Sequence, residues 1–404
     1  QSDFRAETGE EPYWTDAAFG GMPTYQLGAY YPHNYIKKLD SVLRFLPRPA
    51  DYLFLYFIGF YILLLCLKLD YKLAFLGAIA FGFSTYFIII LGVGHNAKAH
   101  AIAYMPMVLG GIILTFRQKL IGGFSLLAIA MALEIQANHF QMTYYLLLLV
   151  IILGIVYLID AFKKKKIPQY FKALGVMIVA VILAIGTNAT NLIATQEYTS
   201  HSTRGDTGLT ITPNGDDKPE AGLTYDYITT YSYGIAETLD LFVPGFMGGS
   251  GAEDVGEDSA LYSELQKMGV SPIQAKSFTE NAPTYWGQQP IVAGPAYIGA
   301  TVLFLFIFAL FLIRGRLKWW VVGGTVLTLL LSWGKNFGFF TEFFIDYVPL
   351  YNKFRAVSSI QVIVELCVPL LAIVGLSCLF ANKHTKEEKI EALKWSSIIT
   401  AGLA

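Results

Sequence analysis

Residues 143–166 have the sequence TYYLLLLVIILGIVYLIDAFKKKK, an apolar run that ends in four consecutive lysines. Because about 20 helical residues cross the roughly 30 Å of hydrocarbon in a bilayer, this run predicts a membrane-spanning helix. Basic residues collect on the cytoplasmic side of such helices. The lysines therefore predict which end of the helix faces the cytoplasm.

Comparable apolar runs recur along the chain. Eight more are long enough to span a membrane, and a shorter tenth run ends with the chain; they cover residues 52–67, 73–92, 101–116, 121–136, 173–194, 296–313, 319–334, 357–380 and 395–404. Hydrophobic residues make up 54% of the sequence, which suits a bundle of such helices and gives no support for binding of nucleic acid. The sequence predicts an all-α polytopic membrane protein, a multi-span helical bundle.

Basic residues cluster in alternate gaps between these runs. Five gaps hold 16 of the 29 Lys and Arg residues: Lys68 and Lys72; Arg117 and Lys119; Lys163 to Lys166 with Lys172; Arg314, Arg316 and Lys318; and Lys383, Lys386, Lys389 and Lys394. We expect these gaps to be cytoplasmic. The other gaps carry most of the acidic residues and are expected on the outside.

This alternation divides the chain into a first outside loop (1–51), transmembrane helices (52–195), a mixed, loop-rich outside insert (196–295) and further transmembrane helices (296–404). Because no apolar helix precedes the first loop, we expect one upstream of it, and more chain beyond the last residue. Residues 35–46 have apolar side chains at helical spacing with basic ones between them. This pattern favours a helix on the membrane surface as much as an ordinary amphipathic helix in a solvated loop.

The second outside gap, residues 94–100, has the sequence GHNAKAH. His95, Lys98 and His100 offer hydrogen-bond donors to a phosphate at the membrane surface, although a solvated rim would have the same composition. A metal site is not favoured, because the two histidines do not share a helical face. The three cysteines of the chain lie inside apolar runs and lack the spacing of a metal site or a disulfide framework.

The third outside gap, residues 137–142, contains Asn138 and His139 and follows Glu134 and Gln136 at the end of an apolar run. An ionisable group within a span is costly unless it meets water or a partner. These residues therefore line a wet cavity or form satisfied hydrogen bonds between helices.

The last outside gap contains Arg355, whose guanidinium suits bidentate contact with a phosphate or snorkelling to lipid headgroups. Glu365 follows inside the next run, about 12 Å from its start. A carboxyl at that depth must be protonated, paired or hydrated.

The insert is too long for a simple connection, so we expect a lid or small domain. Residues 211–220 and 248–258 are predicted loops, and residues 259–268 a short helix. The chain has no Walker A sequence, no Rossmann fingerprint and no hydrolase or zinc-protease motif. Chemistry on the outside face without ATP indicates a lipid-linked donor.

Four motifs resemble the YfhO family of bacterial membrane proteins, in the form found in Bacteroidetes: WTDAAFGGMP at 14–23, GHNAKAH at 94–100, STRG at 202–205 and NKFR at 352–355. That family looks like a member of the C-type glycosyltransferase superfamily, multi-span enzymes that take a sugar from polyprenyl phosphate at the outer face of the cytoplasmic membrane. The resemblance implies a polyprenyl-phosphate-linked sugar as donor. It also implies an envelope glycan, lipid or protein as acceptor, and contact with membrane lipids.

In that superfamily an acidic residue of the first outside loop acts as a base or helps to hold a metal. The resemblance implies such a role for Asp3, Glu7 or Asp16, with Asp3 nearest to the expected place. Where the superfamily often has another acidic residue this chain has its cationic second gap, so a divalent metal is compatible with the sequence but not indicated. The residues expected to contact substrate are His95, Lys98, His100, Glu134, His139, Arg204 and Arg355.

Two other classes of function fit the same sequence. A transporter or flippase for a lipid-linked envelope precursor would use Glu134, Glu365 and the histidine-rich gap as a hydrated path. A scaffold in envelope assembly would tolerate the loss of charges in the outside gaps.

Overall fold

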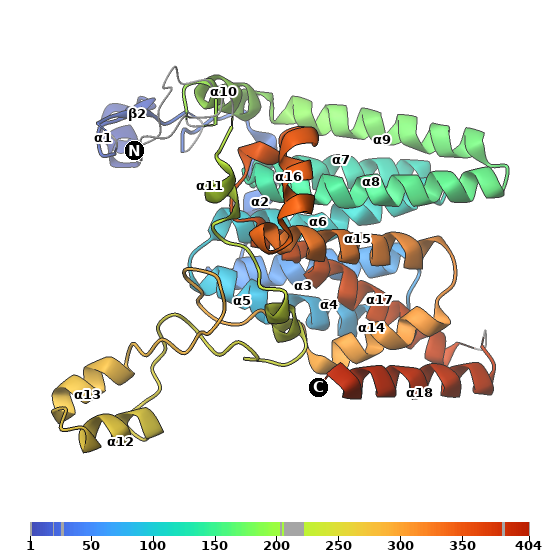
Figure 1. Cartoon of the computed structure of the whole chain (residues 1–404). Coiled ribbons are helices and arrows are strands. Elements are labelled where there is room, and N and C mark those ends of the chain that lie inside the picture. Colours follow the sequence, from blue (N-terminus) through green and yellow to red (C-terminus); the bar gives the residue numbers. More distant parts are fainter. Residues whose placement is uncertain are drawn as a thin grey trace.

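The computed structural model describes residues 2–18, 20–25, 28–202, 204–205, 222–381 and 384–403. They form a bundle of long helices, with irregular and partly helical segments gathered at one end (Figure 1). The chain is therefore mainly α-helical, as predicted. Four of the predicted features lie outside the described residues: the loop at 211–220, and Phe19, Thr203 and Lys383.

The described elements fall into two sets along the chain. Up to residue 200 they are α1 (Ser2–Thr8), β1 (Trp14–Thr15), β2 (Met22–Pro23), α2 (Tyr35–Leu43), α3 (Ala50–Cys66), α4 (Tyr71–Gly82), α5 (Thr85–Gly92), α6 (Asn96–Phe116), α7 (Leu120–Gln136), α8 (Phe140–Lys163), α9 (Ile167–Thr187) and α10 (Ala189–Ser200). From residue 222 they are α11 (Tyr225–Thr229), η1 (Ala236–Leu241), α12 (Ala260–Lys267), α13 (Pro272–Thr279), α14 (Ala300–Leu312), α15 (Arg316–Ser332), η2 (Gly334–Phe337), α16 (Gly338–Tyr347), η3 (Tyr351–Lys353), η4 (Val357–Gln361), α17 (Val362–Phe380) and α18 (Lys386–Leu403), where η marks a 3-10 helix. The two strands form one short antiparallel pair.

Several described helices are long and apolar enough to cross a membrane. Four qualify alone, namely α6, α8, α9 and the continuous segment of η4 and α17. Two bent pairs, α4 with α5 and α15 with the η2–α16 segment, raise the number to six if each pair is one span. The helices α3, α7 and α14 are apolar but shorter. Each of the nine predicted runs thus lies wholly or for the most part in apolar helix, and the length criterion supports four to six of them.

Two runs differ from their prediction. The run at 173–194 is broken between α9 and α10 at Asn188, whose side-chain amide donates to the carbonyls of Ala184 (2.9 Å) and Ala132 (3.0 Å). Residues 395–403 form the second half of α18, whose first half is charged. That helix is not among the described helices that are apolar enough to cross a membrane.

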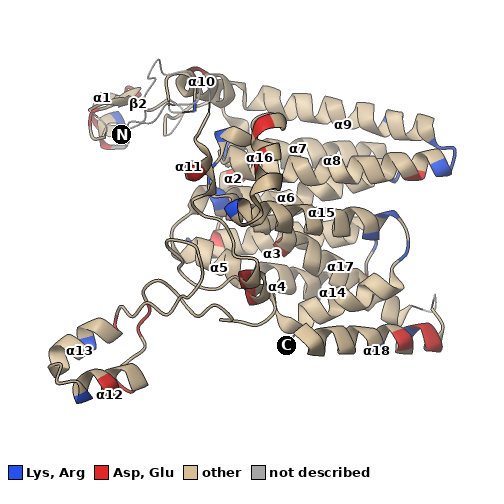
Figure 2. Ribbon diagram, in the orientation of Figure 1, with Lys and Arg blue, Asp and Glu red and all other residues tan. Residues whose placement is uncertain are grey.

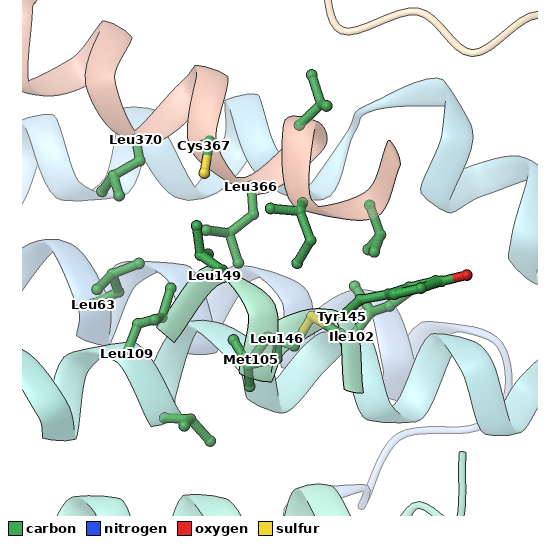
Figure 3. Close-up of a cluster of buried hydrophobic side chains, with 14 of the residues drawn as sticks. Leu63, Ile102, Met105, Leu109, Tyr145, Leu146, Leu149, Leu366, Cys367 and Leu370 are labelled. Atoms are coloured by element: carbon green, nitrogen blue, oxygen red, sulfur yellow. The ribbon is translucent and has the colours of Figure 1, made fainter. Parts of the chain in front are cut away.

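Helix α6 lies at the centre of the bundle, and 89% of an apolar 18-residue stretch of this helix is buried inside the protein. Glycines allow its neighbours to approach closely, as is common between membrane helices. A Cβ at Gly59 of α3 would lie 2.6 Å from the carbonyl oxygen of Ala103, and one at Gly111 would lie 2.6 Å from the amide nitrogen of Leu127 in α7. Figure 3 shows where α3, α6, α8 and α17 meet, with buried side chains that include Leu63, Leu109, Leu149 and Leu366.

The gaps that hold the basic clusters meet at one end of the bundle, which we call the basic end (Figure 2). Hydrogen bonds join these gaps one to the next: Arg117 to the carbonyl of Cys66, Gln118 to the carbonyl of Gln169, Arg316 to Asp160, and Arg314 to Glu388. Because these bonds connect successive alternate gaps, the predicted alternation of the chain between two ends is present in the fold. We call the other end the insert end.

The insert is anchored to the helices through its backbone. Four backbone hydrogen bonds connect the two parts: Leu223 N–H to Asn352 C=O, Tyr233 N–H to Ser332 C=O, Ala356 N–H to Ile228 C=O and Ser358 N–H to Tyr231 C=O. Buried backbone groups need hydrogen-bond partners, and here each part supplies partners for the other. These bonds hold residues 222–242 against the bundle. The α12–α13 arm extends away from it (Figure 1). Helix α12 confirms the short helix predicted at 259–268, and the Ser259 hydroxyl caps it by accepting from the amide of Tyr262 at 3.1 Å.

Candidate functional site

The insert end contains a cavity of about 470 Å³, which we call the insert-end cavity. Its walls come from α5, the start of α6, the α7–α8 turn, the insert and the segment that precedes α17. Four residues predicted to contact substrate line it: His95, Lys98, His139 and Arg355. The fold therefore brings together side chains from three separate outside gaps.

Lys98 provides the positive charge on the side of the cavity that α6 forms. Gly94, with a φ of 78°, turns the chain into α6, and His95 occupies the N-cap position. The Nζ of Lys98 donates to the hydroxyl of Ser359 at 3.1 Å. Burial and the nearby Lys98 charge lower the pKa of His139 to about 4 and also lower the pKa of His95. Both imidazoles are thus mainly neutral at pH 7, and Lys98 supplies positive charge.

Arg355 adds a second cation. It donates to the hydroxyl of Tyr227 at 2.7 Å and lies 5.1 Å from the centre of that ring. Its backbone carbonyl accepts from the side-chain amide of Gln141 at 2.6 Å. The next residue, Ala356, has a φ of 56°. Residues with a Cβ rarely adopt this left-handed conformation, and those that do are common at binding sites.

Two carboxylates that sequence reasoning missed also line the cavity. Glu237 and Asp240 lie three residues apart on η1, and side chains at that spacing share one face of a 3-10 helix. Glu237 accepts from the hydroxyl of Tyr285 (2.7 Å) and the amide of Gln289 (2.9 Å). Asp240 accepts from the backbone N–H of Met247 at 3.0 Å. Burial raises the pKa of Asp240 against the lowering effect of that N–H, and the neighbouring Glu237 charge raises it further.

The cavity also has an apolar side. Ile89, Ile90 and Val93 contribute to it from α5 and the residue that follows the helix, and Ile291 and Val292 contribute from the insert. Cations, carboxylates and an alkyl-lined wall therefore occur in one space. A ligand with an anionic group, a hydroxyl-bearing group and a hydrocarbon chain would match all three.

His100 lies elsewhere, although it is only two residues from Lys98. Successive residues turn by about 100° around a helix, so these two side chains leave α6 in different directions. His100 lines a second cavity of about 360 Å³, together with Gln136 and Asn138. Its Nε2 lies 2.5 Å from Oδ1 of Asp40, which comes from α2.

Asp40 is the centre of a buried polar network and is 2% exposed. It accepts from the hydroxyl of Tyr104 (2.7 Å) and from Nε of Arg44 (2.9 Å), and Arg44 also binds Asp51 at 3.0 Å. Burial would raise the pKa of Asp40, but its hydrogen bonds with His100 and Tyr104 and the charge of Arg44 lower it overall. This network fixes α2, the helix predicted for the membrane surface, to α6.

The two buried carboxyls within the apolar runs, Glu134 and Glu365, line neither cavity. Glu134 is fully buried, and both of its oxygens accept from the Thr143 hydroxyl, at 2.9 and 2.8 Å. This geometry fits a satisfied interhelical hydrogen bond better than a place beside water. Glu365 accepts from the hydroxyl of Ser84, while its Oε1 has no hydrogen-bond partner within the described part of the chain.

Four other predicted site residues lie outside the insert-end cavity. The Nε of Arg204 donates to the carbonyl of Lys353 at 3.0 Å, and the backbone carbonyl of Arg204 accepts from the Lys353 ammonium at 2.9 Å, so Arg204 ties the insert to the segment that carries Arg355. Asp3 and Glu7 are exposed on α1, and Asp16 is exposed after β1. Since none of the three acids lines the cavity, its geometry gives no support to their predicted role as the base.

No protein-family model, curated protein or solved structure matches the chain. In the described ranges, no group of three or more His, Cys, Asp or Glu side chains is placed to hold a metal ion. The geometry of the insert-end cavity is thus the basis for assigning a function.

Proposed function

We propose that the protein is an integral-membrane glycosyltransferase that moves a sugar from a polyprenyl-phosphate donor to a cell-envelope acceptor. One observation carries the proposal: Lys98 and Arg355 share the insert-end cavity with Asp240. A reaction that expels a phosphate needs positive charge at the leaving group and a base at the attacking hydroxyl. The cavity contains groups of both kinds.

In the proposed reaction the acceptor hydroxyl oxygen attacks the anomeric carbon of the donor sugar. A new C–O bond forms as the bond between that carbon and the phosphate oxygen breaks, and polyprenyl phosphate leaves with the bonding electron pair. Lys98 and Arg355 stabilise the charge on the phosphate. Asp240 accepts the hydroxyl proton, and its raised pKa makes it a stronger base than an ordinary aspartate.

The shape of the cavity supports a lipid-linked donor. Its volume of about 470 Å³ lies within the usual range of small-molecule sites and would hold a sugar with its phosphate. The apolar wall from α5 offers a place for the first part of the polyprenyl chain. The basic residues at the opposite end favour a cytoplasmic location for that end, which would put the cavity on the outer side of a bacterial cytoplasmic membrane.

A transporter or flippase for the same kind of lipid is the second candidate. Gln361 lines the cavity, and Glu365, one helical turn further on, keeps an unpartnered Oε1 within the described residues. A buried carboxyl in that position suits a proton-coupled step. Such a protein would bind the donor in the same cavity without changing it covalently.

The test uses the full chain in lipid nanodiscs with a labelled polyprenyl-phosphate sugar and a panel of envelope glycans, lipids and peptides. We expect labelled acceptor and free polyprenyl phosphate to form in equal amounts, and Asp240→Asn to slow the reaction by about 10²- to 10⁴-fold. Asp346→Asn removes an exposed carboxylate outside the cavity and is the matched control. Movement of intact donor across liposomes would favour the transporter instead. Failure to bind or consume the donor with any acceptor would refute the glycosyltransferase.

A further inference from the structure

A third polar cavity, also of about 360 Å³, lies at the basic end of the bundle. Its lining comes from the α6–α7 gap, the α8–α9 gap and the start of α15. The proposed reaction at the insert end uses none of these residues. We call it the basic-end cavity.

The basic-end cavity has an excess of positive charge. Its cations are Arg117, Lys164, Lys166 and Arg316, and Asp160 is the one acid among its described lining residues. Asp160 lies 2.8 Å from Lys164 and 3.1 Å from Arg316, so a single carboxylate is shared by two cations. The cavity keeps an excess of positive charge that the phosphate of a bound ligand would partly offset.

The two arginines are held in place before any ligand binds. Arg316 lies 4.1 Å from the centre of the Tyr157 ring, and Arg117 donates to the carbonyl of Cys66. The ring of Phe116 lies 4.4 Å from that of Tyr157, centre to centre, and forms part of the same wall. Guanidinium groups fixed in this way bind phosphate oxygens with little further loss of freedom.

An apolar groove begins beside this cavity. It has a volume of about 530 Å³ and runs between α7 and α9, with Ile121, Phe171 and Val179 among its lining residues. Gln118 and Tyr170 line the cavity, and Leu120 and Phe171 line the groove, so the two spaces lie near each other at the starts of α7 and α9. A charged cavity near an apolar groove matches a headgroup and its acyl chain.

We propose that the basic-end cavity binds the phosphate of an anionic phospholipid, with an acyl chain in the α7–α9 groove. Basic pockets between membrane helices on the cytoplasmic side are suited to such headgroups. A free phosphate ion could meet the same cations, but it would leave the groove without a role. The site is separate from the proposed glycosyl transfer and can be tested without a sugar donor.

The test is a titration of the delipidated full chain with phosphatidylglycerol, followed by native mass spectrometry. Lys164→Gln/Lys166→Gln should weaken binding about tenfold or more, because charge-assisted hydrogen bonds to phosphate are lost. Lys72→Gln/Lys386→Gln removes the same charge from exposed positions outside the cavity and should leave binding unchanged. Thermal unfolding of each variant checks that the fold is kept.

A second variant separates a lipid from a free ion. A Cβ at Gly175 would meet no atom within 4 Å, so this position has room for a side chain and Gly175→Leu places an alkyl group in the groove. It should weaken binding of phosphatidylglycerol but leave binding of inorganic phosphate unchanged. Equal binding of phosphatidylglycerol and phosphatidylcholine, equal affinity in the lysine variant and wild type, or full binding by Gly175→Leu would each overturn the proposal.

Discussion

The Nζ of Lys98 donates a hydrogen bond of 3.1 Å to the hydroxyl of Ser359. This contact joins the first turn of α6 to η4, the helix that begins just after Arg355. Two cations that are distant in the sequence thus come to line one cavity. A phosphate placed there would meet charges held by two different helices.

Removal of either cation should weaken binding of the donor. A hydrogen bond to a charged group contributes about 1.5–3 kcal/mol, so Lys98→Ala and Arg355→Ala should each reduce affinity by about ten- to a hundredfold. Lys335→Ala, an exposed lysine outside the cavity, should have no effect. Binding of labelled donor to protein in nanodiscs measures this. Unchanged affinity in Arg355→Ala would remove that residue from the site.

Asp240→Asn should separate turnover from binding. The amide keeps the size of the side chain and an oxygen that can accept from Met247, but it cannot take a proton. We expect the rate of sugar transfer to fall by about 10²- to 10⁴-fold, the usual contribution of a general base, while affinity for the donor stays the same. A parallel loss of donor affinity would show that Asp240 holds the substrate rather than activating the acceptor.

The same substitution should stabilise the fold at neutral pH. The folded-state pKa of Asp240 is raised, so the stability linked to this group is present at low pH and is lost as pH rises through that pKa. Asparagine has no carboxyl to ionise, so the variant does not lose this stability as pH rises. The advantage of Asp240→Asn in melting temperature over wild type should therefore grow with pH and then level off. A difference in melting temperature that stays constant across the acid range would contradict the raised pKa of Asp240.

The insert-end cavity also shows which features a sequence can predict. His95, Lys98 and Arg355 can be recognised in the sequence because they lie beside apolar runs, and such runs can be identified from neighbouring residues alone. Glu237 and Asp240 cannot be recognised in this way, because residues 222–242 show no periodic pattern of apolar residues. Their position depends on backbone hydrogen bonds to residues more than a hundred positions away, such as the one from Leu223 to Asn352.

His139 should make the fold sensitive to acid. Its folded-state pKa is lowered to about 4, whereas an unfolded histidine has a pKa of about 6.5. Between these values the unfolded chain binds a proton that the folded chain does not, so stability falls as pH decreases from about 6.5 to about 4. His139→Gln should lose less stability than wild type over this range. Thermal unfolding of both proteins at a series of pH values would measure the difference.

Asp40 should be essential for the attachment of α2. Asp40→Ala removes the partner that Arg44 and His100 share and leaves Arg44 with Asp51 alone, and loss of a hydrogen bond to a charged group costs about 1.5–3 kcal/mol. Because the folded pKa of Asp40 is lowered, its contribution is present above the unfolded value and is lost as pH falls through the folded one. We expect faster proteolysis within residues 34–48. Ser41→Ala on the same helix is the control, and equal cleavage of the two variants would refute the anchoring role.

The orientation of the bundle can be tested with single cysteines in a background that lacks Cys66, Cys367 and Cys378. Met268, at the end of α12, is 79% exposed, and Lys163 is exposed at the basic end. If the basic end is cytoplasmic, a membrane-impermeant thiol reagent should label Met268→Cys in intact cells, and Lys163→Cys only after the membrane is opened. The reverse pattern would place the insert-end cavity in the cytoplasm, and an outer-face glycosyltransferase would then be excluded.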